Sequence, residues 1–331
     1  MEIKNTHLID RYKRNLNYLR ISITDRCNLR CLYCRPSGAG YKLKHREILR
    51  YEEILRITRI GIRLGISKIR ITGGEPLVRK DCCEFLGALT RLRGLNDISL
   101  TTNGVLLTDY IDPIAAAGIK RLNISLDTLD RNKYKEITGV DAFERVWQGI
   151  EAARTKGIDP IKINVVALNG INDDELTDLA ALSFQYPFHI RFIEYMPIGH
   201  TRLCDKAPLL YPQIRSRLER LGELLPVARA PHDGPAMRYK FKGAIGEIGF
   251  ISAVSRHFCN ECNRLRLTAD GRIRPCLLAD IHEDIKTPLR AGRLDTELAD
   301  VFFRAVKRKP FQHPVKLDPN AINGEMVRIG G

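Results

Sequence analysis

Three closely spaced cysteines near the N-terminus point most directly to chemistry. Cys27, Cys31 and Cys34 follow one another with three and then two intervening residues. A structural zinc site has four ligands, and a cubane iron–sulfur cluster usually takes one thiolate for each of its four irons. The group therefore predicts either a zinc site that takes a fourth ligand such as His45, or a cluster with one iron left open to a substrate or cofactor.

A second group of three cysteines lies near the other end of the chain. It has spacings of two and then thirteen residues and comprises Cys259, Cys262 and Cys276. By spacing alone, a zinc site completed by His257 or His282 explains this group at least as well as a cluster does. The basic run Arg264-Leu265-Arg266 lies within this group, so a zinc-stapled nucleic-acid-binding protein is an alternative.

Composition and charge limit the classes of protein to which the chain can belong. The chain has 331 residues, 44% of them hydrophobic, which suffices for one large domain with an appendage. Residues 1–14 lack the apolar core of a signal peptide, and no apolar run reaches membrane-spanning length. We therefore expect a cytoplasmic protein without a membrane partner, whose nine cysteines are ligands or free thiols. A net charge of +15 favours an anionic partner, either nucleic acid or a polyphosphate.

The elements that must position these residues alternate between strands and helices. Six short aliphatic runs are typical of buried parallel strands: Tyr18–Thr24, Lys68–Thr72, Asp97–Thr102, Lys120–Leu126, Ile161–Leu168 and His189–Tyr195. Helical patterns lie between them over Tyr51–Leu64, Asp81–Leu92, Asp109–Ala117, Phe143–Lys156 and Asp173–Ser183. This alternation predicts a parallel α/β fold, for which a doubly wound open sheet is the default.

A barrel or partial barrel is favoured because special residues follow one strand after another. These residues are Gly73-Gly74-Glu75-Pro76, Asn103-Gly104, Asp127, Asn169-Gly170 and Met196-Pro197. In a βα barrel the active site forms at the C-terminal ends of the strands, so these turns and the first cysteine group would share one rim. From about residue 199 the regular alternation of strands and helices ends, and a helical pattern over Tyr211–Leu221 and a strand-like run over Glu247–Ser252 follow. We assign residues 1–198 to the barrel and 199–331 to a segment that closes it.

The first cysteine group resembles the signature of the radical S-adenosylmethionine superfamily. Its spacing, the preceding Thr24-Asp25-Arg26 and the Tyr33 before the last cysteine carry the resemblance. The resemblance implies a partial (β/α)6 TIM-type barrel and a 4Fe-4S cluster on the three cysteines, with S-adenosylmethionine at the open iron. Gly73, Gly74 and Glu75 match the segment that receives the amino group of this cofactor. The cofactor contacts that the resemblance implies are Tyr33, Gly74, Ser125 and Met196.

The second cysteine group resembles the C-terminal segment of the GTP 3′,8-cyclase family of molybdenum cofactor biosynthesis. The matching stretches are Gly249-Phe250-Ile251-Ser252, residues 258–271, Cys276-Leu277 and the final Ile329-Gly330-Gly331. The resemblance implies a lyase that converts GTP to 3′,8-cyclo-7,8-dihydro-GTP, with a second 4Fe-4S cluster held by the C-terminal segment. The GTP contacts that it implies are Arg20, Arg70, Thr101, Lys162, Arg264, Leu265 and Arg266.

The same resemblance implies the course of the reaction and the partners. An electron from a reductant such as flavodoxin or ferredoxin cleaves S-adenosylmethionine, and the 5′-deoxyadenosyl radical removes the ribose 3′ hydrogen of GTP. No residue beyond the clusters and this radical is implied as catalytic. A downstream cyclic pyranopterin monophosphate synthase is an expected partner, nucleic acid is not, and the enzyme is a monomer or a homodimer.

Some features of the chain are left without an assignment. The residues indicate no role for Cys82, Cys83 or Cys204, and they do not decide whether Gly330 and Gly331 enter the active site. Another radical enzyme, such as a peptide modifier, is an alternative, although such enzymes usually carry more than three C-terminal cysteines.

Overall fold

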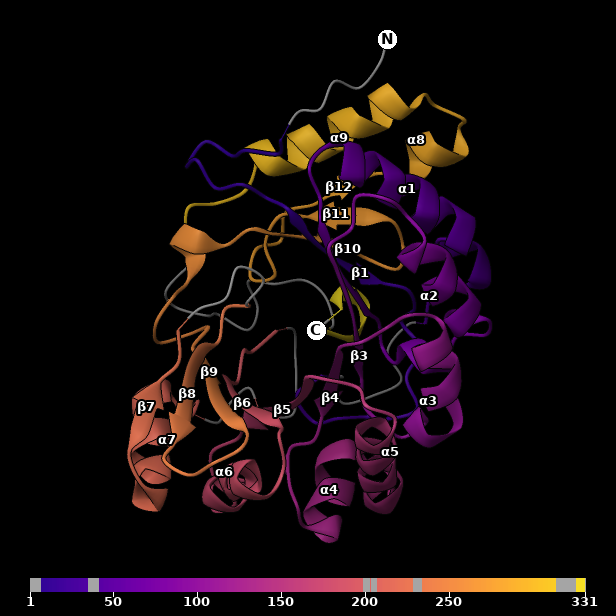
Figure 1. Cartoon of the computed structure of the whole chain (residues 1–331). Coiled ribbons are helices and arrows are strands. Elements are labelled where there is room, and N and C mark those ends of the chain that lie inside the picture. The colour runs from indigo at the N-terminus through magenta and orange to yellow at the C-terminus, as the bar shows by residue number, and fades with distance from the viewer. Residues whose placement is uncertain are drawn as a thin grey trace.

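One curved sheet of twelve strands runs through the chain (Figure 1). The structure is a computed structural model that describes residues 7–34, 42–198, 203, 207–228, 234–313 and 326–330. Six neighbouring parallel strands form the middle of the sheet: β1 (Tyr18–Ser22), β2 (Lys68–Thr72), β3 (Asp97–Thr102), β4 (Leu122–Ser125), β5 (Ile161–Ala167) and β6 (His189–Glu194). These strands are the six that the sequence predicts, with ends that differ by two residues at most.

The order of the strands decides between the two predicted architectures. A doubly wound sheet reverses its direction of winding partway, whereas β1 to β6 follow one another in sequence order without a reversal. The outermost strands are not neighbours in this order, so the described sheet is open. The predicted partial (β/α)6 barrel is therefore confirmed, and the doubly wound alternative is wrong.

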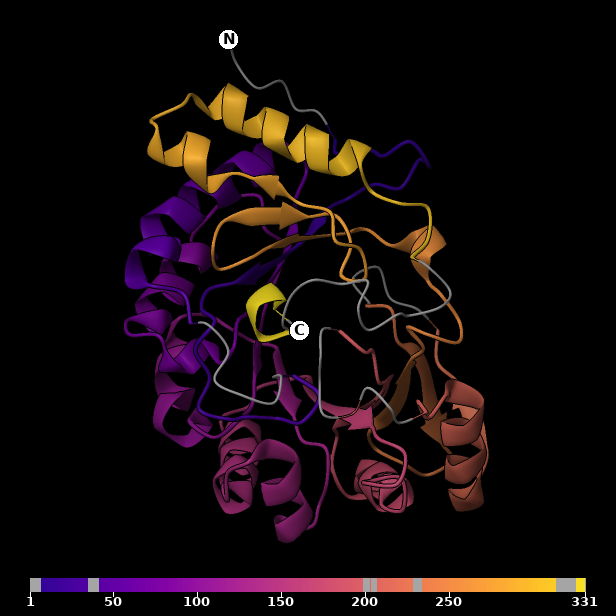
Figure 2. The same ribbon diagram turned by 180° about the vertical axis from the view of Figure 1, so that it is seen from behind.

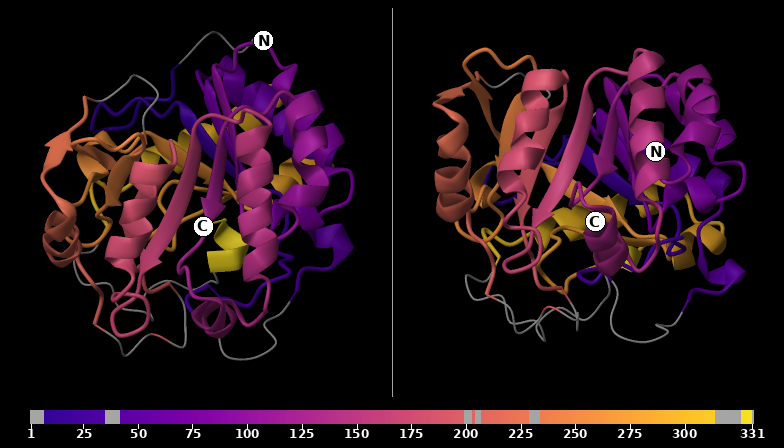
Figure 3. Two further views of the ribbon diagram at one scale, coloured as in Figure 1. Left: turned by 60° about the horizontal axis from the view of Figure 1, so that its bottom comes forward. Right: turned by 90° about the horizontal axis from the view of Figure 1, so that it is seen from below.

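Helices cover the convex side of the sheet (Figure 3). The predicted ones are α1 (Tyr51–Arg63), α2 (Cys82–Thr90), α3 (Leu107–Ala116), α5 (Phe143–Thr155) and α6 (Leu176–Gln185). The sequence analysis missed α4 (Arg131–Thr138), which begins after the N-cap Asp130 and ends at the left-handed Gly139. Among the described helices, none is both long and apolar enough to cross a membrane.

The C-terminal segment supplies strands at both edges of the barrel (Figure 2). Strand β9 (Glu247–Ile251) lies parallel to β6, and β10 (Arg264–Leu267) lies parallel to β1. Antiparallel strands extend each edge: β7 (Leu224–Pro226), β8 (Met237–Phe241), β11 (Arg272–Arg274) and β12 (Glu283–Asp284). The remaining helices are α7 (Tyr211–Leu218), α8 (Lys286–Arg290), α9 (Asp295–Lys307) and α10 (Met326–Ile329). Part of the segment after residue 199 thus belongs to the barrel wall.

The two faces of the sheet differ sharply in polarity. Residues that point outward along the strands, such as Ile21, Ile69 and Leu265, are fully buried against the helices and form the core. Their neighbours in sequence point inward and are basic: Arg20 lies beside Arg70 on one side and Arg266 on the other. A barrel interior is normally filled by layers of aliphatic side chains. Here the described core lies between the sheet and the helices, and these arginines point into the interior.

The outward position of Leu265 leads to a stability prediction. Leu265→Ala removes a fully buried side chain, so the free energy of unfolding should fall by about 2–5 kcal/mol. Leu294→Ala is the control, because Leu294 is 68% exposed and its loss should cost little. Urea unfolding of the metal-free chain measures both. Equal stability of the two variants would contradict the placement of Leu265 in the core.

Candidate active site

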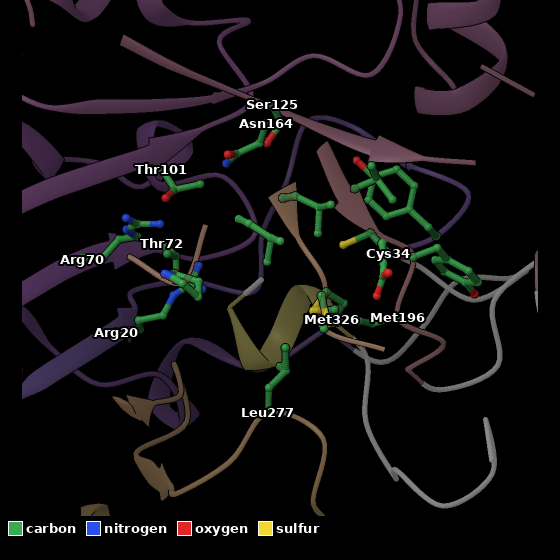
Figure 4. A pocket seen from close by; sticks show the side chains of 18 of the residues that line it. Arg20, Cys34, Arg70, Thr72, Thr101, Ser125, Asn164, Met196, Leu277 and Met326 are labelled. Carbon is green, nitrogen blue, oxygen red and sulfur yellow. The ribbon is translucent and has the colours of Figure 1, made fainter. Parts of the chain in front are cut away.

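Both cysteine groups line a single cavity inside the barrel, and Figure 4 shows part of its lining. The cavity has a volume of about 300 Å³ and is lined from every strand of the parallel sheet, and by Met326 of α10. The sequence separates Cys34 from Cys259 by more than two hundred residues, yet both line this space. Arg20, Arg70 and Thr101 gather at one side, whereas Cys34 and Met196 lie at the other (Figure 4).

The first cysteine group sits on the loop that leaves β1, as predicted. The backbone N–H of Arg30 donates to the carbonyl of Thr138 at 2.7 Å, and that of Leu32 to Ile137 at 2.9 Å. The loop is thus fixed to the end of α4. Burial raises the pKa of the Cys31 thiol well above its usual value, and Cys34 adds to the effect. Three crowded thiols are stable as thiolates only beside a cationic partner, so this donor set fits an iron–sulfur cluster.

Two glycines bring the exit of β2 against this loop. The backbone N–H of Gly74 donates to the carbonyl of Thr24 at 2.6 Å. A Cβ on Gly74 would lie 2.2 Å from the carbonyl oxygen of Arg26, so no other residue fits without moving the backbone. Gly73 and Gly74 both line the cavity, where they leave main-chain groups within reach of a ligand.

The carboxylate of Glu75 does not face the cavity. It is 1% exposed and accepts hydrogen bonds from the N–H of Leu77 at 3.1 Å, the hydroxyl of Thr102 at 2.8 Å and the N–H of Asn103 at 2.6 Å. Burial raises the pKa of Glu75 to about 7 despite these bonds. The carboxylate thus anchors the exit of β3, in contrast to the expectation that it receives the amino group of the cofactor.

The four residues that the sequence analysis assigned to the cofactor all line the cavity: Tyr33, Gly74, Ser125 and Met196. The hydroxyl of Tyr33 donates to Asp127 at 2.7 Å, and the N–H of Val166 donates to the other oxygen of Asp127 at 2.8 Å. These bonds tie the cysteine loop to β5. Burial raises the pKa of Asp127 to about 6. When this carboxyl group is ionised, it places a negative charge near Cys31.

The opposite wall of the cavity is basic. Of the described residues that line it, five are arginines: Arg20, Arg70, Arg191, Arg264 and Arg266. The sequence analysis missed Arg191, a 5% exposed residue on β6 that donates to Asn123. Burial, with Arg266 as the next cause, holds the pKa of Arg20 well below its usual value. Closely packed guanidinium groups favour an anionic ligand.

Several buried polar atoms at the cavity have no hydrogen-bond partner within the described chain. They belong to Thr101, Asn164 and Arg191, through Oγ1, Oδ1 and Nε. Such atoms are costly to leave unpaired, and a polar ligand would satisfy them. Thr101 was predicted as a substrate contact, whereas Asn164 was not.

Two predicted substrate contacts, Lys162 and Leu265, are not among the residues that line the cavity. Lys162 is 8% exposed at the start of β5, where it acts electrostatically on His189 and Glu247 rather than lining the cavity. Leu265 alternates with the two arginines of β10, so its side chain points into the outer core. Only its main chain lies between the cavity arginines.

A buried lysine contacts the second cysteine group. The ammonium of Lys309, 2% exposed, donates to Cys262 Sγ at 3.5 Å and to the carbonyls of Arg264 at 2.8 Å and Pro275 at 2.6 Å. It therefore ties together the two stretches that carry Cys262 and Cys276. Burial raises the pKa of the Cys262 thiol, but Arg264 and Lys309 outweigh this and lower it to about 7. A thiolate is favoured here, as a cluster ligand requires.

Two histidines complete the surroundings of this group. Ligand atoms of His257, Cys259 and His313 lie within 4.8 Å of one another, which also suits a metal ion. His282, the other histidine that the sequence offered, instead pairs with Arg272 at 2.7 Å and does not line the cavity. No disulfide joins any of the eight described cysteines, and Cys204 lies outside the described residues.

The C-terminal tail lies inside the mouth of the barrel (Figure 2). Arg266 donates to the carbonyl of Gly330, and Met326 lines the cavity. Gly330 has a φ of +80°, and a Cβ there would lie 2.5 Å from the hydroxyl oxygen of Thr72. A glycine is therefore required where the tail passes the end of β2. Gly331 lies outside the described residues.

Sequence comparison places this site in a known family. A model of the Radical SAM superfamily matches residues 21–182, and one of Molybdenum Cofactor Synthesis C matches residues 188–315. A GTP 3′,8-cyclase of Moorella thermoacetica is 50% identical over 326 residues, 97% of this chain and 99% of that protein. That of Thermodesulfovibrio yellowstonii is 48% identical over 97% of this chain and 99% of its own length. The chain belongs to the GTP 3′,8-cyclase family.

Solved structures support the fold of this GTP 3′,8-cyclase family member. Streptococcus suis SuiB has a TM-score of 0.61 at 17% identity, covering 88% of this chain and 67% of that one. Native anSMEcpe with bound AdoMet has a TM-score of 0.60 at 16% identity, covering 89% and 81%. Membership of a radical S-adenosylmethionine family implies one 4Fe-4S cluster and S-adenosylmethionine.

The contacts of Lys309 predict a cost for its removal in this cyclase family member. Lys309→Met leaves the buried carbonyls of Arg264 and Pro275 without their donor, so the free energy of unfolding should fall by about 2–4 kcal/mol. Lys307→Met, at the exposed end of α9, removes the same charge and should cost little. Urea unfolding of the metal-free chain compares them. Equal loss in both variants would contradict a structural role for the buried ammonium.

Proposed function

We propose that the chain is a GTP 3′,8-cyclase, which converts GTP to 3′,8-cyclo-7,8-dihydro-GTP in the first step of molybdenum cofactor biosynthesis. The observation that carries this proposal is a single cavity that has two cysteine groups and a wall of five arginines. High identity to curated cyclases over nearly the whole chain supports it.

Cys27, Cys31 and Cys34 hold a 4Fe-4S cluster in this proposal, and S-adenosylmethionine binds beside it. When bound, the cluster and S-adenosylmethionine would supply the one-electron chemistry that removes a hydrogen atom from a carbon of the substrate. The main chain at Tyr33 and Gly74, the hydroxyl of Ser125 and the thioether of Met196 orient the cofactor. The fit rests on a cavity that these residues line together.

The basic wall binds the triphosphate of GTP. Arg20 has Arg70 and Arg266 as neighbours across the strands, and like charges at this spacing repel. An anion between them relieves the repulsion. Thr101 and Asn164 offer further polar atoms to the nucleotide. Lys162 and Leu265 remain predicted contacts.

Cys259, Cys262 and Cys276 hold a second 4Fe-4S cluster, with the guanine bound next to it. The positive surroundings from Arg264 and Lys309 support thiolate ligands. A zinc ion on His257, Cys259 and His313 is the competing occupant, because their ligand atoms already lie close together. Iron, sulfide and zinc analysis of anaerobically prepared protein separates the two.

In this proposal the parts of the chain before and after residue 198 have different roles. Residues 1–198 provide the radical-generating barrel, and residues 199–331 bind the second cluster and close the mouth, which excludes water from a reactive intermediate. Flavodoxin or ferredoxin as reductant, a cyclic pyranopterin monophosphate synthase as downstream partner and a cytoplasmic location complete the proposal. In this proposal the chain acts as a monomer or a homodimer.

Deuterium at the ribose 3′ position tests the reaction. Reconstituted protein with S-adenosylmethionine, reductant and 3′-deuterated GTP should transfer the label to 5′-deoxyadenosine and form the cyclic product. The triple variant Cys27→Ala, Cys31→Ala, Cys34→Ala should give neither product. The triple variant Cys259→Ala, Cys262→Ala, Cys276→Ala should still form some 5′-deoxyadenosine but without label, because the ribose is no longer held in place. Mass spectrometry reads both products.

Three results would contradict parts of this proposal. Cyclic product from the first triple variant would remove the radical assignment. Normal label transfer and product from the second would make that cysteine group merely structural. A zinc-loaded second group in active protein would replace the second cluster with the competing metal site.

Substrate charge gives a separate prediction. Arg70→Met should weaken GTP binding by about 10-fold or more, because a charge-assisted contact is lost, and leave the iron content unchanged. Arg59→Met is the matched control, since Arg59 is exposed on the outer helix α1. Calorimetry at two salt concentrations also checks that higher salt weakens binding. Equal affinity of the wild type for guanosine and GTP would contradict a triphosphate site.

A further inference from the structure

Lys309 directs a buried positive charge at the second cysteine group. It follows the end of α9 by two residues and is 2% exposed. An ammonium group has three N–H donors, and each of them has an acceptor here. The acceptors are the carbonyls of Arg264 at 2.8 Å and Pro275 at 2.6 Å, and Cys262 Sγ at 3.5 Å. The ammonium is therefore fixed in one place, with one donor directed at a cysteine sulfur.

This buried charge needs a negative partner. The two carbonyls that accept from it are neutral. Burial lowers the pKa of Lys309 below its usual value, and Cys262 and then Cys276 oppose this effect. The nearby Arg14 is different, because Asp10 pairs with it at 2.6 Å. A buried ammonium is costly without a counter-ion, so the cysteine sulfurs are the groups that must carry the negative charge.

Lys309 reaches the cysteines from behind, away from any substrate. Cys262 and Cys276 line the cavity, whereas Lys309 does not. Its two carbonyl contacts lie close to these ligands in sequence, because Arg264 follows Cys262 by two residues and Pro275 directly precedes Cys276. A change at Lys309 thus alters the surroundings of the sulfurs without removing a group from the cavity wall.

The first cysteine group offers a comparison within the same chain. Cys27 Sγ accepts hydrogen bonds from the N–H of Leu29 at 3.4 Å and the side-chain amide of Asn103 at 3.7 Å. Both of these donors are neutral, whereas the donor at Cys262 carries a full charge. A positive charge and a hydrogen bond at a ligand sulfur favour the reduced form of an iron–sulfur cluster, since that form is more negative by one charge.

We propose that Lys309 is a positioning residue that acts through Cys262: its ammonium is the counter-ion of the ligand sulfur and raises the reduction potential of an iron–sulfur cluster on the second cysteine group. This inference rests on the proposed function, because it takes a 4Fe-4S cluster as the occupant of Cys259, Cys262 and Cys276. It assigns to the chain a residue that touches no substrate and yet sets how readily this cluster accepts an electron.

A redox titration followed by electron paramagnetic resonance tests the proposal. The full chain with Cys27→Ala, Cys31→Ala and Cys34→Ala is the parent, because only the second group can then hold a cluster. Lys309→Gln removes the charge and keeps N–H donors, and Lys309→Met removes both. At a fixed potential each should raise the ratio of oxidised to reduced cluster about tenfold, which is about 59 mV toward more negative potential for one electron.

Two further variants separate charge from structure. Lys307→Met removes an exposed charge at the end of α9, so it should leave the potential of the parent unchanged. Lys309→Arg keeps the charge and should hold the iron content and the potential closer to those of the parent than Lys309→Gln does. If both neutral variants lose iron while Lys309→Arg retains it, the requirement for a counter-ion is supported.

The results that would overturn the argument fall at two levels. A parent protein that contains zinc, or no iron and sulfide, would overturn the second cluster of the proposed function, whatever Lys309 does. A parent with a full cluster, and an unchanged potential in Lys309→Gln and Lys309→Met, would overturn only the role of Lys309. Loss of iron from all three Lys309 variants would also overturn that role, because the side chain would then serve the fold alone.

Discussion

The repulsion among the arginines inside the barrel is the constraint on which the rest of the structure depends. Strands β10, β1 and β2 place Arg266, Arg20 and Arg70 side by side on the inner face of the barrel. Neighbouring strands are only about 4.8 Å apart, so these charges interact strongly in a poorly solvated interior. Burial accordingly holds the pKa of Arg20 far below its usual value. These positive charges are stable side by side only if they line a space that can bind anions. Aliphatic side chains therefore cannot fill the interior of this barrel as they do in an ordinary one.

Stability must then come from the opposite face of the same strands. Ile21, Ile69 and Leu265 are fully buried between the sheet and the helices, each one residue away from an inward arginine. The C-terminal segment adds to this by occupying both edges of the six-stranded barrel, which would otherwise expose unpaired backbone. Because β10 carries both Arg264 and Arg266 directly after Cys262, one short segment joins the substrate wall to the second cysteine group.

Much of this arrangement could be predicted from the sequence, and the misses have physical causes. The runs that form β2 and β3 are aliphatic, and their ends were predicted to the residue. The sequence does not predict β10, because its Arg-Leu-Arg-Leu alternation resembles a solvated basic run. In the structure the arginines point into the barrel and the leucines point outward. Helix α4 is too polar to show an apolar face, although Asp130 and Gly139 mark its ends. The direction of a side chain, as at Glu75, Lys162 or Arg191, depends on strand register that one sequence does not reveal.

The two cysteine groups differ in the charge around them, and this difference has a chemical consequence. Near Cys31, burial, the other thiols and Asp127 all oppose further negative charge. Near Cys262, Arg264 and Lys309 favour it, strongly enough to lower the pKa of that thiol to about 7. Nearby charge and hydrogen bonds to sulfur set the potential of an iron–sulfur cluster. The two groups therefore offer a cluster different electrostatic surroundings: thiols and a carboxyl at the first, and an ammonium and a guanidinium at the second.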